Sequence, residues 1–427
     1  MQGAIQIPTE IFDDMGPVGE EKRFDIFQEF HEYLESTFPL VYSKLNVSKV
    51  NTYGIHMEWK GKDLSLKPYL FMGHQDVVPV PEATLSRWAH PPYSGHYDGQ
   101  FVWGRGASDC KNVLIGILES FEVLLDKGFE PERTLLIAFG FDEEIGGWQG
   151  AQYLSQHIQD AKGKGSLELI MDEGGLGIQE LYGAKFALPG VGEKAFFTTL
   201  QCTAEYAPGI SPWLRKAIKA SLKSPKSAKE VTNCVAKKDI ALRYLMQTSQ
   251  ATDIISGGLK INALPEKVQA IINHRIAVES NTDDIRVRYK SLVEKEILPR
   301  FPLALDAWGT ISGNTSSDSA GKIILSDFQT PLEPSPISPY NSSAYKIFTG
   351  TIKQVFGEDY IVAPSVMTGN TDTVFYWELS SNIYRFSPVR DESRVNMHTV
   401  DERIDMKEHV EGVRFYVQMI LNGGIPG

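Results

Sequence analysis

The stretch Tyr69-Leu70-Phe71-Met72-Gly73-His74-Gln75-Asp76 places a histidine and an aspartate directly after a run of apolar residues. A short apolar run that ends in glycine is typical of a buried strand. In α/β sheets, functional groups lie just beyond the carboxyl ends of such strands. A histidine there can bind a metal ion, and an aspartate two residues later can orient its ring. A single His-x-Asp pair is more often structural, so the interpretation depends on whether the pattern recurs.

The pattern recurs at two further strands, each followed by carboxylates and then glycines. The apolar run 134–141 precedes Asp142-Glu143-Glu144-Ile145-Gly146-Gly147, and the run 167–171 precedes Asp172-Glu173-Gly174-Gly175. Neighbouring carboxylates repel one another and therefore need solvent or cations around them. A solvated acidic loop is the plain alternative, but the buried strand before each group and the glycines after it favour a site.

Two more candidates lie outside these strands. Asp109 follows the glycine-rich turn 103–106 and comes just before residues 112–125, whose apolar spacing predicts a helix that ends at Gly128. Its plain interpretation is a helix N-cap, and its alternative is a carboxylate that bridges two metal ions. His398 lies near the end of the chain. Two histidines, a shared aspartate and further carboxylates suit a pair of zinc ions, which together can promote a hydrolysis.

The composition agrees with a soluble enzyme of two domains. The chain has 427 residues, of which 42% are hydrophobic and 22% are charged, and these values are ordinary for globular domains. Its net charge of −12 argues against nucleic acid as a partner. The cysteines Cys110, Cys202 and Cys234 give no disulfide framework. No apolar run predicts a membrane span or a signal peptide, so we expect no membrane contact by this segment.

Residues 60–190 alternate between strand and helix patterns, which predicts an α/β fold with a mostly parallel sheet. We expect a catalytic domain in two parts, residues 1–192 and 326–427, with an inserted smaller α+β lid domain at residues 193–325. Further periodic segments predict helices at 21–36, 211–238, 282–298 and 343–356 and a strand at 268–278.

These residues resemble the motifs of the co-catalytic dizinc peptidases that include carboxypeptidase S, aminoacylase, carnosinase and the N-acyl-amino-acid hydrolases. The resemblance is closest to the fungal vacuolar branch of carboxypeptidase S, the Gly-X carboxypeptidases. It covers nearly the whole chain, through IQIPTEIFDDMGPVG (5–19), GHQDVVPVP (73–81), WAHPP (88–92), GHYDGQFVWGRGASDCK (95–111), FGFDEEIGG (139–147), MTGNTDT (367–373) and the segment 396–404.

The resemblance implies a phosphorylase/hydrolase-like zinc exopeptidase fold and removal of the C-terminal residue of small peptides by metal-activated water. An aminoacylase or N-acyl-amino-acid hydrolase is the alternative, because both kinds of enzyme cleave an amide beside a free carboxylate. Vacuolar or secretory location, small peptide substrates and a homodimer formed through the lid are implied in the same way.

The resemblance also implies two Zn²⁺ ions, the second exchangeable for Co²⁺ or Mn²⁺. Asp109 is expected to bridge them, and Glu173 is the alternative to its neighbour Asp172 as a ligand. The expected ligands are His74, Asp109, Glu144, Asp172 and His398.

Four other residues take roles around the metals. Asp76 is expected to hold the imidazole of His74, and Glu143 to act as the general base. Asn370 and Arg385 are expected to bind substrate, with Arg385 as a fixed cation for its carboxylate. An ordinary salt bridge is an equal alternative for Arg385.

One departure from the family concerns the lid. Family members follow the Glu-Lys strand, here 192–197, with a Gly-His-Ser segment whose histidine reaches the substrate. Here the chain runs through Leu200 into residues 201–208, which resemble a later part of the lid. A strand-to-helix portion is therefore expected to be missing, and with it a donor to the developing oxyanion. An inactive relative that binds metal or peptide is the resulting alternative from another class.

Overall fold

The computed structural model describes residues 1–192, 196–238, 240–244, 246–277, 280–328, 330–333, 335–367 and 369–424. The chain divides into two compact units, one formed by Met1–Lys219 with Pro336–Gly427 and the other by Ala220–Ser335. The boundaries near residues 193 and 325 that the sequence suggests stay a prediction. In the described part of the chain, no helix is both long and apolar enough to cross a membrane.

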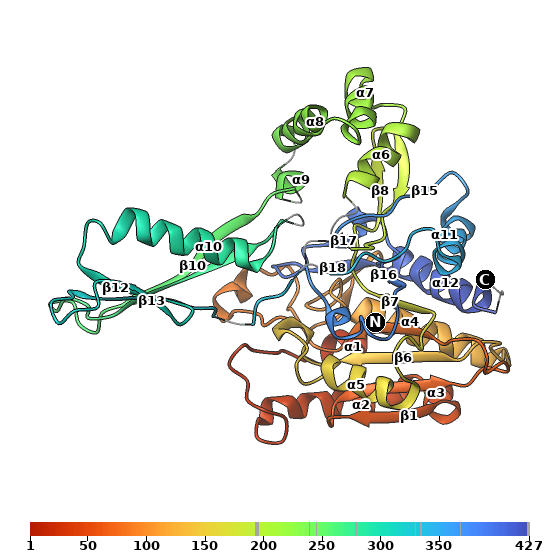
Figure 1. Cartoon of the computed structure of the whole chain (residues 1–427). Coiled ribbons are helices and arrows are strands. Elements are labelled where there is room, and N and C mark those ends of the chain that lie inside the picture. The colour runs from red at the N-terminus through yellow and green to blue at the C-terminus, as the bar shows by residue number, and fades with distance from the viewer. Residues whose placement is uncertain are drawn as a thin grey trace. The chain divides into compact units, whose positions relative to one another are not determined.

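The first unit is built on a mixed six-stranded sheet (Figure 1). In spatial order its strands are β1 (Asn46–Val50), β2 (Gly54–Trp59), β6 (Leu135–Gly140), β3 (Tyr69–His74), β7 (Leu169–Asp172) and β16 (Ile383–Arg385). The last four of these run parallel to one another, whereas β2 is antiparallel to both β1 and β6. The strands expected at 69–72, 134–141 and 167–171 are thus present, and an antiparallel edge is added to them.

Both faces of this sheet are covered by helices, as the apolar run of β3 requires. Tyr69 and Phe71 belong to the larger hydrophobic cluster on one face, and Leu70 and Met72 to the cluster on the other. The larger cluster includes residues of α2 (Ile26–Thr37), α3 (Pro39–Lys44), α4 (Lys111–Asp126), α11 (Ser343–Phe356) and α12 (Met406–Asn422). On the opposite face lies α5 (Ala151–Lys162), and Figure 1 shows α4 and α5 on opposite sides of β6.

This topology brings the candidate residues to one edge of the sheet. Because β3, β6, β7 and β16 are parallel, their carboxyl ends lie at the same edge. The residues at these ends are His74, Gly140, Asp172 and Arg385. Glu143 and Glu144 follow Gly140 in a 3₁₀ turn at Glu143–Ile145. The polar residues that follow these parallel strands in the sequence therefore lie near one another at one edge of the sheet.

Smaller sheets extend the first unit. One contains β4 (His96–Tyr97), β5 (Phe101–Trp103), β17 (Arg394–Val395) and β18 (Arg403–Asp405), and it joins the segment before Asp109 to the segment around His398. Another contains β8 (Ile178–Leu181), β9 (Ala184–Ala187) and β15 (Ile361–Val362). A short helix, α1 (Gln2–Gln6), begins the chain.

One expectation about local structure is wrong. The family resemblance predicts a strand at residues 192–197, but Phe196 and Phe197 begin helix α6 (Phe196–Tyr206). Its buried positions include Phe196, Thr199 and Thr203, which lie on one face at helical spacing. This spacing favours a helix over a strand. Residues 193–195 lie outside the described part of the chain. Helix α7 (Pro212–Ser221) follows.

The second unit combines helices with two small sheets. Its helices are α8 (Pro225–Lys238), α9 (Ile240–Tyr244) and α10 (Thr282–Leu292), and α10 continues as a π-helical turn at Val293–Ile297. The first sheet pairs β10 (Ser249–Gly257) with β11 (Val268–Arg275), and the second contains β12 (Leu303–Ala307), β13 (Thr310–Gly313) and β14 (Gly321–Leu325). Nearly all of β10 and most of β11 are exposed.

Candidate metal centre

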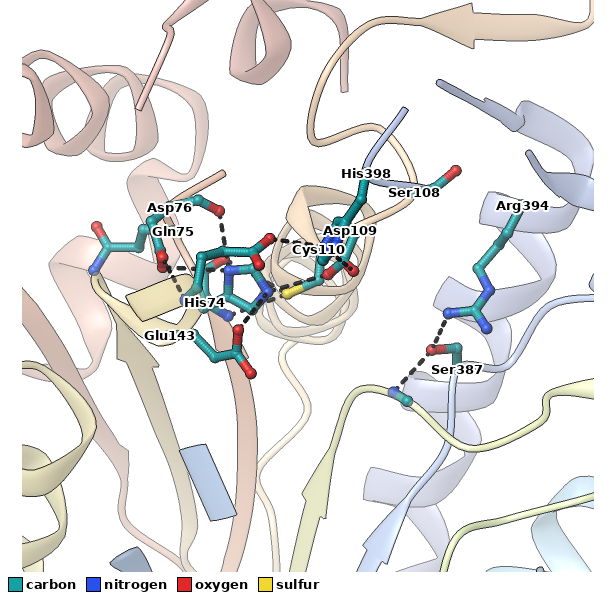
Figure 2. A network of polar contacts seen from close by, with 12 residues as sticks. His74, Gln75, Asp76, Ser108, Asp109, Cys110, Glu143, Ser387, Arg394 and His398 are labelled. Atoms are coloured by element: carbon teal, nitrogen blue, oxygen red, sulfur yellow. Dashed lines mark hydrogen bonds and ion pairs between the residues drawn. The ribbon is translucent and has the colours of Figure 1, made fainter. Parts of the chain in front are cut away.

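His74 is held in one orientation at the end of β3. Its side chain is only 1% exposed, and its Nδ1 lies 3.0 Å from the backbone oxygen of Asp76 and 3.3 Å from Asp76 Oδ1. Its Nε2 lies 3.2 Å from Asp109 Oδ1 (Figure 2). When Nδ1 donates its proton to Asp76, Nε2 carries a free lone pair that can bind a metal ion.

Asp109 lies between two imidazoles. Its Oδ1 faces His74, and its Oδ2 lies 3.2 Å from Nε2 of His398. Nε2 of His398 also lies 3.1 Å from Glu144 Oε1. The N-cap of α4 is Cys110 rather than Asp109, so the plain interpretation of Asp109 is wrong. The carboxylate of Asp109 is instead directed at the two histidines.

Glu143 and Glu144 are presented by a glycine-dependent turn. Gly146 and Gly147 have positive φ values of 104° and 72°, a conformation that favours glycine. A Cβ at Gly147 would also lie 2.5 Å from Asp372 Oδ1. Glu143 Oε2 lies 4.0 Å from Nε2 of His74, so Glu143 faces the same imidazole that Asp109 contacts.

These residues form overlapping groups that can hold metal ions. Potential ligand atoms lie within 4.8 Å of one another in three sets. The sets are His74 with Asp109 and Cys110, His74 with Glu143 and Glu144, and Asp109 with Glu144 and His398. His74, Asp109, Glu144 and His398, all predicted ligands, are therefore brought together, and Glu143, the predicted base, lies with them.

The electrostatics of the cluster favour a bound cation. Burial raises the pKa of Glu143 well above its usual range and also raises that of Glu144. Burial likewise raises the pKa of Glu173 to about 8, and the carboxylates of Asp109 and Asp172 contribute to this rise. Asp172 Oδ2 is buried and has no hydrogen-bond partner among the described residues. Crowded, buried carboxylates of this kind fit divalent metal ions, whose positive charge would offset their repulsion.

Asp172 and Glu173 have different surroundings. Burial is the largest influence on the pKa of Asp172 and raises it. The next two influences, the charge of Arg385 and a hydrogen bond with Thr371, lower this pKa. Burial also has the largest influence on the pKa of Glu173. The second largest is the charge of Asp109, which raises this pKa further. The pKa of Glu173 is thus raised by Asp109 and by Asp172, whereas Arg385 lowers the pKa of both Asp172 and Glu173.

The two predicted substrate residues lie on neighbouring segments. Arg385 Nη1 donates a hydrogen bond of 2.7 Å to the backbone oxygen of Gly369, next to Asn370. Asn370 is exposed. No hydrogen bond or ion pair found among the described residues connects Asn370 to the histidines and carboxylates of the cluster.

Sequence patterns assign no role to several residues at the centre. Cys110 is fully buried, and its Sγ accepts a 3.2 Å hydrogen bond from the backbone amide of His74. Arg394 Nη1 donates to Ser387 Oγ at 2.9 Å, and Ser387 Oγ also accepts from the amide of Gly174 (Figure 2). A single cysteine, serine or arginine outside a strand-end pattern carries no signal in one sequence, and the fold alone brings Cys110 to His74 and Ser387 to Gly174.

The sequence profile of the peptidase family M20/M25/M40 matches residues 70–422. An uncharacterized carboxypeptidase of Schizosaccharomyces pombe is 36% identical, with 98% of this chain and 78% of that protein covered. Carboxypeptidase S of Saccharomyces cerevisiae is 34% identical, with 99% of this chain and 83% of that protein covered. An N-fatty-acyl-amino acid synthase/hydrolase of Bos taurus is 29% identical, with 99% and 87% covered.

Solved structures agree on the fold. An M20 family metallo-carboxypeptidase from Sulfolobus solfataricus superposes with a TM-score of 0.62 at 16% identity, covering 100% of this chain and 98% of that one. The match to the family profile spans most of the chain and includes every residue of the metal cluster. The chain therefore belongs to the peptidase family M20/M25/M40 and is a hydrolase of the metallo-exopeptidase type.

Proposed function

We propose that this protein is a zinc-dependent carboxypeptidase that removes the C-terminal residue of small peptides of the Gly-X type. The observation that carries the proposal is the position of Asp109, whose two oxygens each lie 3.2 Å from a different histidine. A carboxylate placed between two imidazoles is suited to share two ions. Such a pair polarises a scissile carbonyl and lowers the pKa of water.

The proposed ligands divide between two ions. His74 would hold one ion and His398 the other, and Asp109 would contribute to both; Glu144, which lies 3.1 Å from His398, would act on the His398 side. Of the neighbouring pair at the end of β7, the sequence favours Asp172. We keep Asp172 as the proposed ligand, because its Oδ2 is buried and has no hydrogen-bond partner among the described residues, and Glu173 remains the alternative. The second ion is proposed to be exchangeable for Co²⁺ or Mn²⁺.

Glu143 is the proposed general base. It is only 14% exposed, and its carboxylate lies on the His74 side of the cluster. Its carboxylate faces the cluster, so Glu143 can accept a proton from the attacking water and then donate it to the leaving amine. Asp76 keeps His74 in place through the contacts of its carboxylate and backbone oxygen with Nδ1.

Arg385 and Asn370 are the proposed contacts for the substrate. A guanidinium beside the cluster can bind the terminal carboxylate that a carboxypeptidase must recognise. Arg385 is tied to the loop of Asn370 through its bond to Gly369. The two residues therefore belong to segments that are in contact.

An N-acyl-amino-acid hydrolase is the second candidate, and the 29% identity to the bovine N-fatty-acyl-amino acid synthase/hydrolase favours it. Both candidate substrates present an amide beside a free carboxylate, so they differ only in the acyl part. Rates on a Gly-Leu dipeptide with a blocked amino end, on N-acetyl-leucine and on a long-chain N-acyl-leucine separate the two. A clear preference for the long-chain substrate would overturn the carboxypeptidase proposal.

The expected loss of part of the lid motivates a third candidate, an inactive relative that binds metal or peptide. The alignment to carboxypeptidase S of S. cerevisiae spans 485 positions, whereas this chain has 427 residues, so at least 58 positions of the alignment face a gap in this chain. The alignment to the bovine enzyme spans 472 positions, so at least 45 of its positions face a gap in this chain. Zinc content measured together with turnover separates an inactive relative from an enzyme, because the former binds zinc without hydrolysis.

We further propose a vacuolar or secretory location, small peptides as partners, and a homodimer formed through the lid. The dimer proposal is supported by exposed apolar side chains on and around the β10–β11 hairpin. Among these are Ile254, Ile255, Leu259, Ile261 and Leu264, each more than half exposed. Sedimentation equilibrium tests it, and a monomer at micromolar concentration would overturn it.

A further inference from the structure

A buried ion pair joins the two loops that carry Asp109 and His398. Arg105 is 3% exposed and Glu402 is completely buried, and Arg105 Nη1 lies 2.5 Å from Glu402 Oε2. Arg105 precedes Asp109 by four residues, and Glu402 follows His398 by four. The pair therefore connects two segments that are remote in sequence but supply neighbouring groups to the cluster.

Glu402 also contacts the backbone of Asp109 itself. Its Oε1 accepts hydrogen bonds from the amides of Ser108 at 2.8 Å and Asp109 at 3.2 Å. Its backbone oxygen accepts a bond of 2.8 Å from the amide of Gly104. A second link runs between the same loops, because Ser108 Oγ donates to the backbone oxygen of Arg403 at 2.7 Å. Glu402 thus holds both ends of the turn that presents Asp109, one through its backbone oxygen and the other through its carboxylate.

The loop of His398 needs such support. Asn396, His398 and Asp401 have φ values of 60°, 60° and 64°, a region that residues other than glycine rarely adopt. The side chain of His398 is 51% exposed, so packing of that side chain does little to hold it. Arg105 Nη1 contacts this loop directly, at 3.4 Å from the backbone oxygen of Thr399.

We propose that Glu402, together with Arg105, is a positioning residue of the metal centre that sets the separation of Asp109 and His398. Its specific consequence is the affinity for the ion that these two residues share, while the ion on the His74 side depends on it less. This inference rests on the proposed metal centre. A buried ion pair is weak evidence for added stability but can specify one arrangement of loops, which is the role assigned here.

The test is Glu402→Gln in the full chain. The amide oxygen keeps an acceptor for Ser108 and Asp109, while the charge opposite Arg105 is lost. Zinc binding to metal-free protein is measured by competition with a chromophoric chelator, and Co²⁺ binding by its visible absorption. We expect one of the two binding events to lose about 10–100-fold in affinity, as changes to groups that orient ligands do, and the other to change less, with an altered Co²⁺ spectrum.

A matched control is Glu408→Gln. Glu408 is 7% exposed and forms an ion pair with Arg390, and neither residue belongs to the metal cluster. This variant should lower thermal stability without changing zinc affinity. Arg105→Lys is the second test variant, since it keeps the charge and supports folding; it should weaken the same binding event by less than Glu402→Gln does.

Wild-type zinc affinities in folded Glu402→Gln, or in Arg105→Lys where Glu402→Gln does not fold, would overturn the positioning role. An equal loss of affinity in the Glu408→Gln control would do the same, because the effect would then be one of general stability. A wild-type chain that binds no divalent ion would instead overturn the metal centre on which the inference rests.

Discussion

Asp76 Oδ2 accepts a hydrogen bond of 2.9 Å from the backbone amide of Glu144. The same carboxylate reaches His74 Nδ1 through its Oδ1, at 3.3 Å. Asp76 is completely buried. Its two oxygens contact the end of β3 and the turn that follows β6, and they thereby connect these two segments. One side chain thereby contacts both His74 and the backbone of Glu144, two of the proposed ligands.

Asp76→Asn should therefore weaken both zinc binding and turnover. Asparagine keeps the size but replaces one accepting oxygen with a donor group, so only one of the two contacts can persist. We expect a loss of about 10–100-fold in metal affinity, measured by zinc titration of the metal-free protein. Unchanged affinity in a folded variant would show that backbone contacts alone orient His74.

Glu143→Gln should abolish turnover and retain two zinc ions. The variant removes the proposed base but leaves the cluster of His74, Asp109, Glu144 and His398 intact. Loss of a general base typically costs about 10²–10⁴ in rate, to be measured with a blocked dipeptide, and metal content is measured by mass spectrometry. Glu144→Gln serves as the comparison and should lose metal. The reverse pattern would mean that the two glutamates have exchanged roles.

The elements around the site follow from local pattern. The apolar run at Tyr69–Met72 is buried on both faces of a sheet, and a buried strand needs such a run. Helix α4 follows from the apolar spacing of residues 112–125. The carboxylates that follow strands indicate a site because parallel strands end at one edge.

Other features depend on contacts between distant segments. Glu402 carries no local signal, and its burial against Arg105 emerges only when β18 pairs with β5. The choice between Asp172 and Glu173 depends on the surroundings of each side chain, and sequence alone cannot rank two adjacent residues at a strand end. For helix α6, the family resemblance points to a strand, whereas the helical spacing of its buried residues decides the structure.

Asp109→Ala should lower occupancy at both metal sites, whereas His398→Ala should mainly weaken one. The physical reason is that each oxygen of Asp109 faces a different histidine, while His398 contacts only the Asp109 and Glu144 side of the cluster. Zinc stoichiometry after dialysis against a weak chelator gives the comparison. Full retention of two ions in Asp109→Ala would rule out a shared ligand.

Zinc affinity should rise with pH across neutrality. Hydrogen bonds to Asp109 and then Glu144 raise the pKa of His398 to about 10 in the metal-free protein. The protonated form of His398 therefore stabilises the metal-free fold fully below its unfolded pKa, and this contribution is lost as pH rises through about 10. A zinc ion must displace that proton, so affinity should increase by up to about tenfold per pH unit for each proton released.

Calorimetry in buffers of different ionisation enthalpy measures the number of protons released near neutral pH. We expect at least one proton per chain in the wild type and fewer in His398→Ala. Absence of proton release in the wild type would contradict the proposed role of His398 as a ligand.

Restoring a lid segment between Leu200 and Gln201 should raise turnover. The family resemblance implies that the missing portion supplies a histidine that contacts the substrate, and loss of one oxyanion donor costs about 10²–10³ in rate. The insertion would interrupt the first turns of α6, where the chain now runs from Phe196 into Tyr206 as one helix. We expect the present chain to bind zinc yet hydrolyse peptides slowly, and an insertion copied from a complete relative to recover rate without changing zinc content.

A control insertion of equal length with its histidine replaced by alanine should recover folding of the lid but not the rate. If the chain as it stands already turns over peptides at about 10 per second, the gap has no functional consequence and this expectation is wrong.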